Sequence, residues 1–99
     1  MGRRPHTSQQ ALRLFAALLS APEQWWYGVT LTRQTGLLPG TLYPLLIRLD
    51  AGNYLESRWE AADPPGRPPR HLYRLTPAGR ALASERVAAR QAVEGAALA

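Results

Sequence analysis

The residue types that most often carry enzyme chemistry are sparse in this chain. The two histidines, His6 and His71, are far apart in the sequence, and neither stands in a catalytic or metal-binding motif. The absence of cysteine excludes thiolate nucleophiles, disulfides and cysteine-based zinc sites. Ser20, Ser57 and Ser84 lack any nucleophile motif, and no glycine-rich phosphate loop is present. We therefore expect no catalytic residue, metal or cofactor, and predict that the protein is not an enzyme.

Arginine is the abundant functional group. The 12 basic residues are all arginine, and with seven acidic residues they give a formal charge of +5 and a pI near 10.7. A GC-rich coding sequence would explain the choice of arginine over lysine, but not the excess of bases over acids. Such a balance favours a polyanionic partner, either nucleic acid or an acidic membrane surface.

Length and hydropathy predict one compact domain outside the membrane. The chain has 99 residues, of which 45% are hydrophobic, enough for a real core. It contains no run of about 20 apolar residues that could span a bilayer. The apolar stretch at residues 12–19 is too short for a secretory signal ahead of a domain of this size. We expect a cytoplasmic protein that does not bind membranes.

Hydrophobic periodicity predicts three helices in the first half. Thr7 and Gln10 have capping-box spacing before an apolar stretch, which predicts a helix to about Ser20 that is buried nearly all round. Residues 25–28 are predicted to form a turn with aromatic anchors. A short helix over residues 28–35 should stop at Gly36, and a third should begin at Pro39 and close at Gly52. The third helix carries one apolar stripe, formed by Leu42, Leu45, Leu46 and Leu49.

The second half predicts a hairpin and a final helix. Residues 54–60 and 71–75 are typical of strands, and the proline-rich loop between them makes the pair a wing. A last helix should start after an N-cap at Thr76 and run to about Glu94, fraying near Gly95. The predicted fold is α+β and mainly α, a winged helix-turn-helix with three helices, a two-stranded wing and a C-terminal helix. We divide it into a basic, mobile arm (1–8), a DNA-binding domain (9–76) and a dimerisation helix (77–99).

The third helix is the predicted recognition helix, because its non-leucine face could enter a major groove. Its candidate DNA-binding residues are Gly40, Thr41, Tyr43, Pro44, Ile47 and Arg48. Gly40 permits close backbone approach, Tyr43 offers a hydroxyl to phosphate, and Ile47 can meet a thymine methyl. The alternative is a plain amphipathic helix with a solvated face. Pro44 implies either that the helix begins later or that a kink is kept for shape.

The wing carries the second set of candidate DNA contacts. Arg67 lies at the loop tip, with Arg70 and Arg74 towards the second strand. Arginine in a narrow minor groove is a common electrostatic contact, and prolines lower the entropy that a docking loop loses. The alternative is a surface loop with solvated arginines. The aromatic residues Trp25, Trp26, Trp59 and Tyr73 are predicted to fill gaps between helices and wing.

The order of these motifs resembles the PadR family of transcriptional regulators. The resemblance is carried by residues 40–49 (GTLYPLLIRL), by 66–68 (GRP) and by 73–79 (YRLTPAG), and extends over residues 11–82. It implies a short-form regulator without a separate C-terminal domain, which binds a palindromic operator in double-stranded DNA, normally as a repressor. It also implies a homodimer formed by the first and last helices, here through Leu12, Phe15, Leu19, Leu82, Val87 and Val93.

Two further possibilities follow from the same residues. A winged helix can serve as a protein–protein interaction module, with the face of Tyr43 and Ile47 docking a partner. The charge and the arginine-tipped wing favour DNA instead. RNA binding is less favoured, because no exposed aromatic platform is predicted on a sheet. A small-molecule effector is a further partner whose identity the sequence does not give.

Overall fold

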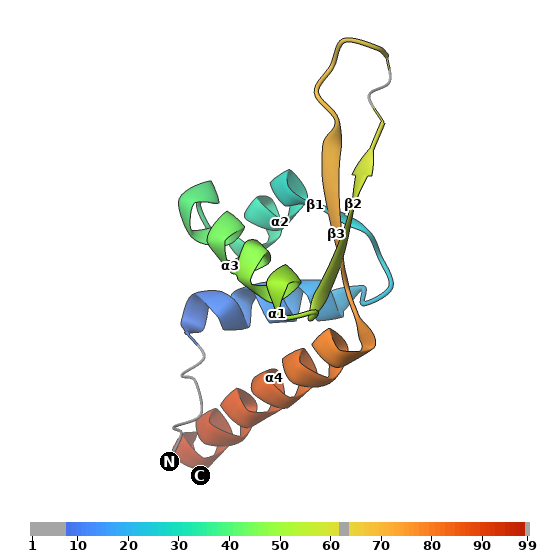
Figure 1. Cartoon of the computed structure of the whole chain (residues 1–99). Helices are drawn as coiled ribbons and strands as arrows, with labels where there is room; N and C mark the ends of the chain where they lie inside the picture. The colour runs from blue at the N-terminus through green and yellow to red at the C-terminus, as the bar shows by residue number, and fades with distance from the viewer. Residues whose placement is uncertain (1–7, 62–63, 99) are drawn as a thin grey trace.

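The computed structural model describes residues 8–61 and 64–98, which form a mainly helical α+β fold. Along the chain the elements are α1 (Gln9–Ser20), β1 (Trp26–Tyr27), α2 (Gly28–Thr35), α3 (Pro39–Ala51), β2 (Leu55–Glu60), β3 (Arg70–Leu75) and α4 (Pro77–Leu98). In Figure 1 the β2–β3 hairpin projects beyond the helices, and α4 extends from the opposite end of the sheet. This arrangement confirms the predicted fold class. Apart from Ser8, the predicted arm lies outside the described residues.

The core lies where α1, α2 and α3 meet one face of the sheet. Its fully buried side chains are Leu14, Leu18, Leu31, Leu42 and Leu46. The sheet contributes Trp26, Leu55, Tyr73 and Leu75, and Leu45 and Leu49 pack at the edge. The predicted leucine stripe of α3 therefore faces inward, which fixes the opposite face of this helix towards solvent. None of the helices in the described part of the chain is long and apolar enough to cross a membrane.

Helix α1 differs from its prediction at its start and in its burial. Its N-cap is Ser8, whose Oγ accepts a hydrogen bond from the backbone N–H of Ala11 at 3.0 Å. Thr7, the predicted cap, lies outside the described residues. Leu14, Phe15 and Leu18 are buried, but Arg13 and Ala16 are exposed. The prediction of burial nearly all round was wrong, because the core and α4 cover only part of this helix.

The connection from α2 to α3 is the tight turn that a helix-turn-helix requires. Helix α2 ends at Gly36, whose backbone N–H donates to the carbonyl of Thr32 at 2.9 Å. The buried Thr35 hydroxyl donates to the Leu31 carbonyl and accepts from the Leu37 N–H. One side chain thus satisfies polar groups on both sides of the turn, which fixes the start of α3 relative to α2.

Helix α3 begins at Pro39, so Pro44 lies inside it. The alternative of a later helix start is therefore excluded. Proline has no N–H to donate, and the Gly40 carbonyl loses its helical partner. Both residues are exposed, so water can satisfy that carbonyl.

The sheet has a third strand that the sequence did not reveal. Its order is β1-β3-β2, and β1 pairs antiparallel with β3, with Trp26 opposite Tyr73 and Tyr27 opposite Leu72. Residues 26 and 27 were predicted to be a turn, and the wing to be two-stranded. Two residues are too few to show the alternation by which strands are recognised.

Helix α4 starts as predicted and runs further than predicted. The Thr76 hydroxyl accepts from the Gly79 N–H at 3.0 Å and donates to the Asn53 carbonyl at 2.7 Å, which ties the helix start to the end of α3. A Cβ on Gly79 would collide with the carbonyl of Tyr54, so this contact needs glycine. The helix continues to Leu98 rather than fraying near Gly95. Ala96 and Ala97, the residue type with the highest helix propensity, follow Gly95 and favour continuation of the helix.

Candidate nucleic-acid interface

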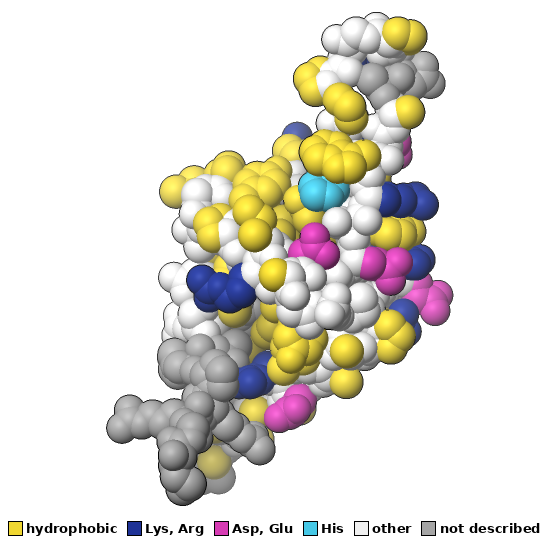
Figure 2. Space-filling model, viewed as in Figure 1, with side chains coloured by type: hydrophobic (Ala, Val, Ile, Leu, Met, Phe, Trp, Pro, Cys, Tyr) yellow, Lys and Arg dark blue, Asp and Glu magenta, His cyan; other side chains and the backbone are white. Residues whose placement is uncertain are grey.

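The outward face of α3 is unusually apolar for a solvated surface. Leu38 is 76% exposed, Ile47 67% and Tyr43 38%, while Gly40, Thr41 and Pro44 are also exposed. Figure 2 shows hydrophobic side chains gathered over this part of the molecule and at the base of the wing. Contiguous apolar side chains on a small protein mark an interaction surface more often than a solvated one.

Tyr43 is held against the start of α2. A Cβ on Gly28 would collide with the Tyr43 ring and hydroxyl, so the tyrosine lies directly over this glycine. The sequence placed Tyr43 on the outer face of α3 but gave no sign of this contact. The close approach of α3 to Gly28 gives the partly exposed tyrosine a fixed position at the rim of the apolar face.

Arg48 lies apart from the other predicted recognition residues. It lines a cavity of about 220 Å³ with Phe15 of α1, Leu82 of α4 and residues at the end of α3. The structure therefore brings together Tyr43, Ile47 and the exposed start of α3, whereas Arg48 faces the side where α1 and α4 meet. The helical wheel alone had grouped all of these residues together.

The wing places Arg67 and Arg70 where a duplex could reach them. Arg67 is exposed in the turn that follows Pro64, and its N–H donates to the Pro64 carbonyl at 3.5 Å. Arg70 is the first residue of β3, and its guanidinium lies 5.2 Å from the centre of the Tyr27 ring. The Tyr27 hydroxyl donates in turn to the Glu60 carboxylate at 2.9 Å.

Arg74, the third predicted wing arginine, is already engaged within the protein. It forms an ion pair with Glu56 at 2.8 Å, and its guanidinium lies 4.4 Å from the centre of the Trp25 ring. Arg58 lies over the same ring at 4.3 Å. Trp25 therefore supports two arginines on the outer face of the sheet.

Three aromatic rings lie in a row along one face of the wing, and the first two are stacked. The Trp59 and His71 rings lie 4.2 Å apart and nearly parallel, and the His71 and Tyr73 rings lie 4.5 Å apart. The Tyr73 hydroxyl lies 2.9 Å from His71 Nδ1. Trp26 and Tyr73 are buried, as predicted for aromatic residues that fill the space between the helices and the wing. Trp59 was predicted to do the same, but it is 67% exposed, so that prediction was wrong. A tryptophan next to the last residue of the predicted strand, beside the polar wing loop, was the one signal that could have revealed this surface.

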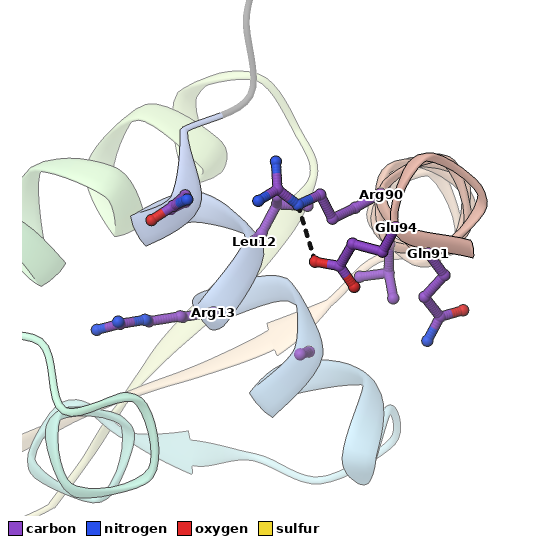
Figure 3. A pocket seen from close by; sticks show the side chains of 8 residues that line it. Leu12, Arg13, Arg90, Gln91 and Glu94 are labelled. Carbon is purple, nitrogen blue, oxygen red and sulfur yellow. Dashed lines mark hydrogen bonds and ion pairs between the residues drawn. The ribbon is translucent and has the colours of Figure 1, made fainter. Parts of the chain in front are cut away.

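The predicted dimerisation residues are distributed over three environments. Leu12 and Val87 line a groove of about 370 Å³ between α1 and α4, shown in Figure 3, which the Arg90–Glu94 ion pair (3.1 Å) borders. Leu19 and Leu82 are half-buried. Phe15 is only 4% exposed, so it packs inside the single chain, whereas Val93 is 64% exposed on α4.

A helix-turn-helix whose second helix has one exposed face, together with an adjacent hairpin that carries arginines, defines a winged-helix protein. A family model described as the transcriptional regulator PadR-like family matches residues 22–85, and the chain belongs to this family. This family is one of transcriptional regulators rather than of enzymes, which agrees with the prediction from the sequence.

Individual relatives agree with this placement. The transcriptional regulator Rv3488 of Mycobacterium tuberculosis is 53% identical over 47 residues, which are 48% of this chain and 41% of that protein. A PadR-like transcription factor from Bacteroides fragilis superposes with a TM-score of 0.72 at 23% identity, over 90% of this chain and 89% of that one. PcaV of Streptomyces coelicolor, solved with its natural ligand, gives a TM-score of 0.67 at 26% identity over 94% of this chain and 60% of PcaV.

Proposed function

We propose that this protein is a sequence-specific repressor that binds a palindromic operator as a homodimer. In each protomer, α3 lies in the major groove and reads bases with the face formed by Gly40, Thr41, Tyr43, Pro44 and Ile47. The wing supplies Arg67 and Arg70 to the minor groove or the phosphate backbone. Such a role would place the protein in the cytoplasm with the DNA.

One observation carries the proposal: the apolar face of α3 lies beside the base of the wing, where Tyr43 and the exposed Arg70 line one cleft, in a chain of net charge +5. Ile47 can contact a thymine methyl, and the exposed glycine and threonine let the start of the helix approach a phosphate. A protein-binding winged helix would also use the apolar face. It would not need the arginines beside it, because interface centres are depleted of charge.

Selection of bound duplexes from a random DNA pool tests this function directly. We expect an enriched palindrome whose half-site centres lie about one helical turn apart, because two-fold symmetric dimers read symmetric sites. An asymmetric enriched sequence would reject the homodimer on DNA. Failure to enrich any sequence would reject specific DNA binding and favour the protein-interaction module.

The proposed dimer rests on α1 and α4. Helix α4 has 22 residues and α1 only 12, so α4 is longer by about 15 Å at 1.5 Å per residue. The exposed Val93 and the groove residues Leu12 and Val87 give this region an apolar surface for a second copy. Because Phe15 is buried within the chain, it supports α1 from inside rather than contacting a partner.

We also propose the groove between α1 and α4 as the site of a small-molecule effector. It has the volume of a small ligand site, and Leu12, Ala16 and Val87 make it largely apolar. PcaV, a relative in fold, was solved with its natural ligand. An Ala16→Leu variant, which fills the groove, should lose any ligand-induced rise in Tm that the wild type shows in a compound screen.

A further inference from the structure

Gly28 is a glycine that its own backbone conformation does not require. It is the first residue of α2 and does not have a positive φ, unlike Gly36 at φ 72°, so a residue with a side chain could adopt its conformation. Glycine is also a poor helix former, because it loses more conformational freedom than any other residue when the chain folds. The reason for a glycine at this position therefore lies in its surroundings.

The space that a side chain at residue 28 would fill is taken by Tyr43 of α3. The three atoms nearest to a Cβ built on Gly28 are the hydroxyl oxygen and two ring carbons of Tyr43, and both ring carbons would lie at 2.9 Å. Carbon atoms in favourable contact are about 3.5–4.0 Å apart. Residue 28 could therefore not carry a Cβ while Tyr43 keeps its present position.

The backbones on both sides of this contact are fixed by other interactions. Strand β1 pairs with β3 directly before Gly28. On α3, Leu42 and Leu46 are fully buried in the core, one residue before and three after Tyr43. On the sheet side Tyr43 is close to Tyr73, whose pKa is raised by burial and, to a smaller extent, by Tyr43 and then by an aspartate. An added methyl group would therefore turn the Tyr43 ring, and the hydroxyl at its end would move furthest.

We propose that Gly28 determines the DNA sequence specificity of this protein by holding Tyr43 in place, without contacting the DNA itself. This inference rests on the proposed function, in which the outer face of α3 reads bases. Ile47 lies four residues after Tyr43 and is therefore its neighbour on the same face of the helix. The contact with Gly28 fixes the Tyr43 hydroxyl relative to the side chain that would meet a thymine methyl. Gly28 is thus a positioning residue.

A tyrosine in a fixed position discriminates between bases better than a mobile one. A side chain that is already ordered in the free protein loses less conformational freedom when it binds. Hydrogen bonds also weaken steeply when the donor and acceptor are misaligned, so a displaced hydroxyl no longer separates one base from another. Tyr43 is 38% exposed, so part of the ring stays available to a partner while the rest is held.

The Gly28→Ala variant tests the proposal through the ratio of operator affinity to random-duplex affinity. We expect this ratio to fall by about 5- to 150-fold per half-site, the range for one misplaced base contact. Affinity for the random duplex at low salt should change by less than about threefold, because phosphate contacts dominate that binding. Gly95→Ala is the matched control, since a Cβ there meets no atom within 4 Å, and it should keep the wild-type ratio.

A double-variant cycle shows whether Gly28 acts through Tyr43. Tyr43→Ala removes the side chain with which the new methyl group collides, so adding Gly28→Ala should not change the ratio further. An equal effect of Gly28→Ala with and without Tyr43 would overturn the proposal, as would a wild-type ratio in the single variant. Weaker binding to both duplexes, together with a lower Tm, would assign Gly28 to the stability of the fold and would also overturn it.

The position of Tyr43 can be followed without DNA. Incorporation of 3-fluorotyrosine labels the four tyrosines of the chain, and a Tyr43→Phe sample identifies the fluorine resonance of Tyr43. Gly28→Ala should shift this resonance and leave that of Tyr54, which follows the C-terminal end of α3, in place. An unchanged Tyr43 resonance would contradict the inference.

The outcomes separate this inference from the proposed function. If the wild type enriches an operator and Gly28→Ala prefers it as strongly, only the role of Gly28 is rejected. If the wild type enriches no operator, both fail.

Discussion

At the scale of single residues, exposure separates the side chains that hold the fold from those left for a partner. Ile47 and Leu46 are neighbours on α3, yet Leu46 is fully buried and Ile47 is 67% exposed. Arg74 and Arg67 are chemically identical, but only Arg74 is paired with a carboxylate and an aromatic ring. The side chains that we propose for DNA contact, such as Ile47 and Arg67, are thus those that are not fully buried or paired within the chain.

Truncation of Ile47 should weaken operator binding without destabilising the protein. A lost base-edge contact costs about 1–3 kcal/mol per site, whereas an exposed side chain adds little to the free energy of unfolding. Fluorescence anisotropy with the selected operator and thermal unfolding measure the two quantities. Gln34→Ala, an exposed change on α2 outside the proposed site, is the control. Arg48→Ala should weaken binding less than Ile47→Ala, and the reverse order would place the DNA on the Arg48 side of α3.

At the scale of elements, α3 is positioned by its leucines and the wing by strand pairing. Leu42 and Leu46 anchor α3 against α1 and the sheet, and the Thr35 hydrogen bonds fix its start. The hairpin pairs from Leu55 opposite Leu75 to Glu60 opposite Arg70, which carries the wing loop beyond the helices. The proposed recognition surface therefore depends on packing at buried residues that would not contact DNA.

The Leu46→Ala change should lower the free energy of unfolding by about 2–5 kcal/mol, because it leaves a cavity in a fully buried site. Chemical denaturation monitored by tryptophan fluorescence measures this loss. Leu38→Ala, at the exposed N-cap of the same helix, should change stability by less than about 0.5 kcal/mol. Equal losses in both variants would contradict the assignment of the buried face.

The wing arginines should contribute to affinity through phosphate contacts. Removing Arg67 and Arg70 together should flatten the salt dependence by up to about 3.5 units in a dimer, at about 0.9 per contact. Arg74→Gln is the matched control, since its guanidinium is held by Glu56 and Trp25 and should leave the slope unchanged. If the wing does not contact the DNA backbone, both the Arg67/Arg70 double variant and Arg74→Gln should show the wild-type salt slope. Preference for operator over random DNA should survive in each.

At the scale of the whole molecule, the two-fold symmetry of the proposed dimer would decide how the two α3 helices and the two wings are placed on DNA. A single protomer offers one α3 and one wing, which suffice for one half-site. Two protomers joined through α1 and α4 would present two such units, and the spacing of the operator would be set by that interface. In this proposed dimer, the C-terminal half of α4 would control DNA binding without contacting the DNA.

Charge placed on the α4 surface should dissociate this dimer. Val87→Glu together with Val93→Glu should sediment as a monomer at micromolar concentration, because like charges would meet across an apolar interface. Ala81→Glu, at an exposed position about 120° round the helix from both Val87 and Val93, should stay dimeric. A wild-type chain that sediments as a monomer, or a double variant that remains a dimer, would reject the interface.

The sequence by itself determined the elements and the family. The spacing of the leucines in residues 42–49, the breaks at Gly36 and Gly52, and the alternation of residues 54–60 are local signals, and they predicted α2, α3 and the hairpin correctly. The Gly-Thr-Leu-Tyr-Pro run indicated the PadR-like family, which the family match confirms. Net charge came from composition alone. These features need no knowledge of how distant segments meet.

Only the tertiary structure decided which residues share a surface. Strand β1 exists because its two residues pair with β3, and a two-residue strand has no periodicity to detect. The separation of Arg48 from Ile47, the engagement of Arg74 by Glu56 and Trp25, and the burial of Phe15 each depend on elements far apart in the sequence. A cleft of about 600 Å³ that is lined by Arg33, Tyr43 and His71 also draws on three such elements. Contacts of this kind are set by packing geometry, which no local pattern encodes.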